Sequence, residues 1–182
     1  MWVIKWCDNY ARGILRCYLA RGGTLFFMED LICSFFGHRE IEETTELREA
    51  IRREILKAID FGYRVFYFGG FGAFDALCHK IITEIKEEKR DFKIERVYCV
   101  VSEYYLRKRH RYLNVEDYED VIYLKPDFDG WYKRIYYRNC AMIDASDYVI
   151  FYVEARADSG AYKAYKYAEK KKKTIINLYK KS

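Results

Sequence analysis

The chain has 182 residues, 51% of them hydrophobic and 34% charged, which predicts a single folded domain and excludes an intrinsically disordered protein. The net charge of +5 arises from 33 basic and 28 acidic residues, and their interspersion does not favour a dedicated DNA-binding face. No apolar run approaches the roughly 20 residues of a membrane helix, and the six cysteines contain no CxxC pair, so we expect a cytoplasmic protein with neither a membrane partner nor a metal site.

The first 27 residues have neither a clear helical nor a clear strand period, and they precede a second methionine, Met28. The codons of Arg21-Gly22-Gly23 can contain a bacterial ribosome-binding sequence a short distance before Met28. We therefore predict that residues 1–27 are a translated leader and that residues 28–182 form one Rossmann-like domain. The alternative is an N-terminal arm that caps a sheet edge.

From Met28 onwards, short apolar runs alternate with segments of helical periodicity. The predicted strands are residues 31–36, 64–68, 94–101, 121–124, 148–153 and 174–178, and the predicted helices are residues 44–62, 74–90, 130–146 and 160–173. Thr44 or Thr45 is the expected N-cap of the first helix, and Gly62 its stop. Strands that alternate with helices imply right-handed crossovers, and uniformly apolar strands imply a sheet covered on both faces. The sequence predicts an α/β, three-layer Rossmann-like fold with a mainly parallel sheet.

Ligands of open α/β sheets bind beyond the carboxyl ends of the strands, where three loops carry suitable groups. In the first, Gly37 permits a sharp turn, and His38 and Arg39 are candidate phosphate ligands, or else cap a helix or face solvent. In the third, Ser159 and Gly160 open a helix whose N–H groups form an anion site, or else Ser159 is a plain cap.

The second loop contains Gly69, Gly70 and Gly72, followed by Asp75. Glycines let backbone N–H groups approach an anion, and the following helix directs its positive end to the same point. The spacing is neither GxGxxG nor the P-loop pattern, so neither a dehydrogenase nor a kinase is supported. Asp75 either complements the helix dipole or binds a ribose hydroxyl. If the three strands are neighbours, the three loops converge on one cleft.

Four stretches, "CSFFGHRE", "FYFGGFGAFDALC", "YRNCAMIDASDYVIFYV" and "SGAYKAYKYA", resemble in order the motifs of the YpsA-like branch of the SLOG superfamily. SLOG is named after the Smf/DprA proteins and the LOG phosphoribohydrolases, and the resemblance covers about residues 28–179. It implies a Rossmann-like domain that binds a nucleotide or a nucleotide-derived ligand and requires no cofactor. The pocket residues implied are Gly37, His38, Arg39, Gly69, Gly70, Gly72, Asp75, Arg138, Asn139, Ser159 and Gly160. Asp144 and Asp147 are expected to shape the turn into the fifth strand.

One departure from the family's pattern bears on catalysis. The glutamate of LOG enzymes falls at Ala164, and the usual threonine falls at Ala161. Without that carboxylate, an oxocarbenium-like transition state needs another acid, for which Asp75 and Glu154 are the candidates. The sequence thus favours a non-catalytic module that senses or sequesters a nucleotide. The alternative is a hydrolase of nucleotide N-glycosidic bonds.

A third interpretation is binding of single-stranded nucleic acid, as the Smf/DprA relatives suggest by analogy. The stretch "YYLRKRHRYLNVEDY", residues 104–118, interleaves basic residues such as Arg107 and Arg109 with tyrosines, a pattern that suits single strands. The same stretch is also compatible with a lid over ligand phosphates, and a solvated surface loop is the ordinary interpretation of such a stretch. The sequence also leaves a homodimer open.

Overall fold

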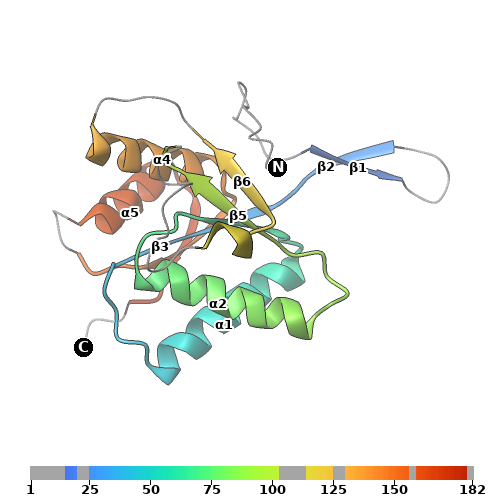
Figure 1. Cartoon of the computed structure of the whole chain (residues 1–182), viewed down its shortest axis with the longest axis horizontal. Helices are drawn as coiled ribbons and strands as arrows, with labels where there is room; N and C mark the ends of the chain where they lie inside the picture. Colours follow the sequence, from blue (N-terminus) through green and yellow to red (C-terminus); the bar gives the residue numbers. More distant parts are fainter. Residues whose placement is uncertain (1–14, 20–24, 103–113, 125–129, 156–158, 180–182) are drawn as a thin grey trace.

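The computed structural model describes residues 15–19, 25–102, 114–124, 130–155 and 159–179 (Figure 1). Its main sheet consists of β3 (Ile32–Gly37), β4 (Val65–Phe68), β5 (Glu95–Val100), β6 (Asp120–Tyr123), β7 (Tyr148–Tyr152) and β8 (Thr174–Asn177). The helices are α1 (Thr45–Phe61), α2 (Ala73–Glu88), α4 (Trp131–Ala145) and α5 (Gly160–Lys170), and η1 (Val115–Asp117) is a short 3₁₀ turn. Within the described residues, no helix combines the length and apolarity needed to cross a membrane.

The six strands run in the order β6-β5-β4-β3-β7-β8, and every neighbouring pair is parallel. From β3 the chain builds outwards through β4, β5 and β6, and it then returns to the other side of β3 to add β7 and β8. The predicted parallel α/β sheet is confirmed. The reversal of direction lies between β3 and β7, which is the position where open α/β sheets form a ligand crevice.

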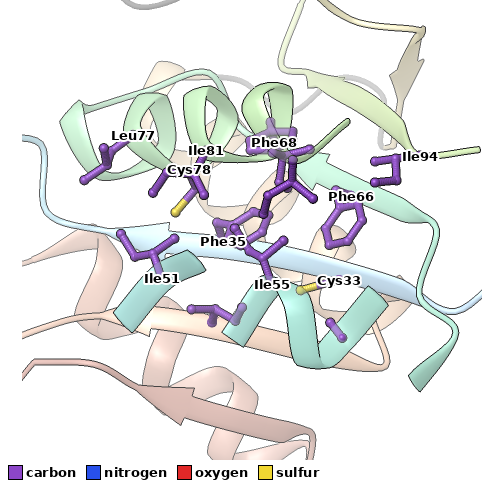
Figure 2. Packing of buried hydrophobic residues seen from close by; sticks show 14 of the residues in the cluster. Cys33, Phe35, Ile51, Ile55, Phe66, Phe68, Leu77, Cys78, Ile81 and Ile94 are labelled. Atoms are coloured by element: carbon purple, nitrogen blue, oxygen red, sulfur yellow. The ribbon is translucent and has the colours of Figure 1, made fainter. Parts of the chain in front are cut away.

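Helices cover both faces of the sheet, which confirms the three predicted layers (Figure 1). Alternate residues of each strand face opposite sides, so Phe66 and Phe68 pack towards α1 and α2, whereas Tyr67 packs towards α4 and α5. Figure 2 shows the first of these two cores, in which strand residues meet side chains of both helices. Its members include Phe35, Phe66, Ile51, Ile55, Cys78 and Ile81.

Local signals placed the ends of α1 correctly. The Thr44 hydroxyl accepts a hydrogen bond from the Leu47 N–H (3.2 Å), and α1 stops at Gly62, whose φ of 115° disfavours other residues. The two aspartates predicted to shape the turn into β7 have different partners in the structure. Asp147 exchanges hydrogen bonds with Ile32 at the amino ends of β7 and β3, where its carboxylate accepts from the Ile32 N–H at 2.9 Å, and Asp144 accepts from the Tyr167 hydroxyl at 2.9 Å.

Near the N-terminus, β1 (Leu15–Leu19) and β2 (Leu25–Glu29) form an antiparallel pair of their own. The sequence shows no clear strand period in residues 1–27, whereas the structure forms these two strands. Within the described residues, neither β1 nor β2 joins the six-stranded sheet. The core of that sheet therefore does not require apolar and polar residues to alternate along β1 and β2. The ladder pairs Arg16 with Met28 and thus crosses the predicted boundary. The leader at residues 1–27 stays a prediction.

A candidate ligand cleft at the carboxyl ends of the strands

A cleft of about 900 Å³ opens at the carboxyl ends of the central strands. The three predicted loops converge on it, because β4, β3 and β7 are consecutive in the sheet. The predicted site residues that line it are Gly37, His38, Arg39, Gly69, Asp75, Arg138, Asn139, Glu154, Ser159 and Gly160. Gly70 and Gly72 are buried and are not among the residues that line it.

Asp75 folds back from the first turn of α2 onto the glycine loop. Its carboxylate accepts the N–H groups of Gly69 (3.2 Å) and Gly70 (2.8 Å), and the residue is only 6% exposed. Burial raises the pKa of Asp75 to about 6, against the lowering effect of the two N–H groups and of Arg138. These two N–H groups therefore bind a carboxylate of the protein itself, which differs from the predicted cradle for a ligand phosphate.

Arg138 projects from α4 and fastens the ends of two strands. Its Nη1 donates to the carbonyls of Gly69 (2.7 Å) and Cys99 (2.9 Å), and the side chain is 4% exposed. A Cβ on Gly69 would lie 2.8 Å from Nη1, so only glycine leaves room for the guanidinium. Burial lowers the pKa of Arg138, while the nearby Asp75 raises it. The Nε atom has no hydrogen-bond partner among the described residues.

The loop after β3 reaches both of its neighbours. The His38 Nε2 accepts the N–H of Glu154 (2.8 Å), which joins the ends of β3 and β7. Nε2 is therefore unprotonated, and any hydrogen bond that His38 donates comes from Nδ1. The carbonyl of Arg39 accepts the Ala73 N–H (2.8 Å), while the Arg39 side chain is exposed at the cleft. The backbone of this loop thus covers the start of α2, which had been predicted to face an anion.

The start of α5 is more open. The Ser159 hydroxyl accepts the Tyr162 N–H (3.3 Å), which confirms the predicted N-cap. A Cβ on Gly160 would meet no atom of the described residues within 4 Å, so free space lies beside this backbone at the cleft. Lys163 is exposed at the cleft one turn along, and Ala164, where LOG enzymes carry glutamate, is 2% exposed. Of the three predicted anion sites, α5 keeps the most accessible backbone.

Aromatic side chains complete the walls, and sequence reasoning did not single them out. They are Phe71 of the glycine loop, Tyr132, Tyr136 and Tyr137 of α4, and Tyr152 and Tyr179 near the ends of β7 and β8. The spacing of Tyr132 and Tyr136, four residues apart in a predicted helix, was an available signal. Of the predicted basic and aromatic stretch, residues 104–118, the part up to residue 113, which holds Arg107 and Arg109, lies outside the described residues.

No protein-family model matches the sequence, and no curated protein matches it. Solved structures share its fold. DNA processing protein A (DprA) from Streptococcus pneumoniae superposes with a TM-score of 0.57 at 12% identity, over 80% of this chain and 49% of that one. The chain thus spans about half the length of that protein.

DprA from Helicobacter pylori, described as having a unique single-stranded DNA binding mode, matches with a TM-score of 0.54 at 17% identity, over 83% of this chain and 66% of that one. A molybdenum cofactor binding protein from the phototrophic bacterium Rippkaea orientalis matches with a TM-score of 0.55 at 18% identity, over 85% and 79%. At 12–18% identity these likenesses show the fold alone, and membership of the SLOG superfamily stays a prediction. The YpsA-like branch stays a prediction.

Proposed function

We propose that the chain binds a nucleotide or a nucleotide derivative in this cleft and acts as a ligand sensor or a sequestering module. One observation carries the proposal, namely that a cleft of about 900 Å³ at the β3–β7 reversal combines a polar floor, an open helix start and aromatic walls. Pockets for small ligands have this size, and they mix apolar walls with a few fixed polar groups.

The geometry favours particular places for the parts of such a ligand. The phosphate belongs at the start of α5, where Gly160 leaves space and Lys163 and Arg39 supply positive charge. The glycine loop contributes differently from the sequence-based prediction, because its N–H groups hold Asp75 in place. Asp75, which lines the cleft, is then a fixed acceptor for a ribose hydroxyl.

Hydrolysis of an N-glycosidic bond is a second candidate. The observation in its favour is Asp75, because a carboxyl with a pKa of about 6 at a cleft can exchange a proton near neutral pH. Against it, both carboxylate oxygens of Asp75 already accept backbone hydrogen bonds, and Ala164 supplies no replacement carboxylate. Glu154 lies at the same cleft and is the other candidate acid.

Binding of single-stranded nucleic acid is a third candidate, favoured by the likeness in fold to the H. pylori protein. It predicts tight binding of an oligonucleotide with a steep salt dependence, whereas a mononucleotide site predicts a shallow one. Fluorescence titration of a labelled oligonucleotide at several salt concentrations distinguishes the two.

Calorimetric titration with AMP, NAD, ADP-ribose and cyclic nucleotides tests the main proposal. Gly160→Ala should leave the melting temperature unchanged, because its methyl group enters open space, yet weaken binding about tenfold or more by obstructing the phosphate. Lys163→Ala should also weaken binding. Lys170→Ala, which removes the same charge from the far end of α5, is the matched control and should not.

Failure of every one of these nucleotides to bind the folded protein would refute the proposal. Release of free base during the same incubations, abolished in Asp75→Asn, would instead establish the hydrolase. Chromatography of the reaction mixtures measures that release directly.

A further inference from the structure

Two tyrosines on one face of α4 stand out among the exposed side chains. Of the described residues, the large hydrophobic ones that are exposed are Phe61 (76%), Tyr132 (83%) and Tyr136 (40%). Tyr132 and Tyr136 are one helical turn apart, which places their Cβ atoms about 5–6 Å from each other. Both line the cleft, whereas Phe61 ends α1 and is not among the residues that line it.

The Tyr136 ring is supported from the side. It packs edge-to-face against Tyr137, with the ring centroids 5.5 Å apart. A hydrogen bond with Cys140 raises the pKa of Tyr136, so its hydroxyl is also engaged on the helix. A ring held in this way loses little conformational freedom when a second ring stacks on it.

The two tyrosines share α4 with Arg138, which together with Asp75 of α2 forms the polar floor of the cleft. Arg138 lies six positions after Tyr132, which corresponds to about 9 Å along α4. A ligand that reaches the floor beside Asp75 and Arg138 therefore has room for a planar group further out, over the tyrosines. Lys133 lies between the two tyrosines in the sequence, and its exposed side chain also lines the cleft. Aromatic and cationic groups together suit an electron-rich heterocycle with nearby phosphate.

We propose that Tyr132 and Tyr136 form a stacking subsite for the nucleobase of the ligand, apart from the phosphate position at the start of α5. The proposal rests on the proposed function and adds to it that the ligand carries a planar aromatic base. Stacking reads the face of a ring and not its edge, so the subsite accepts purines and pyrimidines and prefers the larger purine surface.

The test uses two probes that differ only in the base, AMP and ribose 5-phosphate. In calorimetric titration, the double variant Tyr132→Leu, Tyr136→Leu should bind AMP about 10- to 100-fold more weakly than the unmodified chain, and ribose 5-phosphate equally well. Phe61→Leu, which removes an exposed ring away from the cleft, should change neither affinity. Tyr132→Trp should retain AMP binding, and AMP should quench its added indole fluorescence, which a purely structural role would not produce.

The possible failures are distinct. If neither probe nor any other nucleotide binds the unmodified chain, the proposed function falls, and this subsite with it. If AMP binds but the double leucine variant binds it equally well, the subsite is refuted and the proposed function stands. If sedimentation shows a dimer that the double leucine variant converts to monomers, the tyrosines form a contact between copies of the chain, and the subsite is again refuted.

Discussion

Raising the pH should destabilise this protein through Asp75. Its pKa is about 6 in the folded chain, against 3.8 for an unperturbed aspartate, because the folded protein buries the carboxyl. The folded state therefore holds this proton more tightly than the unfolded state does. The resulting stabilisation is fully present below pH 3.8 and is lost as the pH rises through about 6.

The size of the effect follows from the difference between the two pKa values. A difference of about two units corresponds to about 3 kcal/mol of unfolding free energy, since each unit is worth about 1.4 kcal/mol. Small domains are stable by about 5–15 kcal/mol in total, so a loss of this size is readily measurable. The two backbone N–H groups and Arg138 already limit it, because each favours the ionised form.

Urea unfolding of the unmodified chain and of Asp75→Asn, at intervals between pH 4 and pH 8, measures the effect. The asparagine does not titrate, so the difference in stability between the two proteins should change by about 2.5 kcal/mol over this range, which covers most of the full effect. Parallel pH profiles would refute the reasoning. If Asp75→Asn does not fold, NMR titration of the Asp75 carboxyl carbon gives the pKa directly, and a value near 4 would refute it as well.

Three further perturbations test the surrounding structure. Gly37→Ala should destabilise the fold by about 1–3 kcal/mol in urea unfolding, because its Cβ would lie 2.4 Å from the fully buried ring of Phe74; an unchanged midpoint would contradict the packing. Arg138→Met should cost about 2–4 kcal/mol by removing two charge-assisted hydrogen bonds, and NMR titration should show the pKa of Asp75 raised further. Burial opposes ionisation of Glu119, but hydrogen bonds from Arg96 and Lys86 hold its pKa at about 2. The stability that Glu119 adds should therefore be complete above pH 4.5 and be lost as the pH falls through 2. If Glu119→Gln and the unmodified chain unfold at the same acidic pH, this reasoning is wrong.

Sequence patterns that span only a few neighbouring residues were sufficient to predict the α/β fold. The helical period of residues 44–62 and the caps Thr44 and Gly62 depend on contacts within one or two turns, and the structure confirms them. Apolar runs such as residues 65–68 indicated a sheet covered on both faces. The order of strands and helices then implied parallel pairing, and with it a single edge where the three loops meet.

The use of each polar group at that edge depended on partners distant in the chain. Arg138 binds the carbonyl of Gly69, 69 residues away, and Glu154 donates to His38 across 116 residues. A local sequence pattern does not specify which of several equivalent donors and acceptors will form a hydrogen bond with each other. The starts of α2 and α5 are similar in sequence but differ in the folded protein. The backbone of Arg39 covers the start of α2, whereas the start of α5 opens onto the cleft.

At the glycine loop, the sequence pattern determined the turn, and the tertiary structure decided which group its N–H groups bind. Its glycines and Asp75 indicated a turn next to a ligand site, and the turn is present at the cleft. Burial then decided the chemistry, because a carboxylate that is 6% exposed must find donors, and the N–H groups of Gly69 and Gly70 are the ones within reach. The same donors that the sequence pattern assigned to a phosphate hold Asp75, and packing in three dimensions leaves the space for an anion at Gly160.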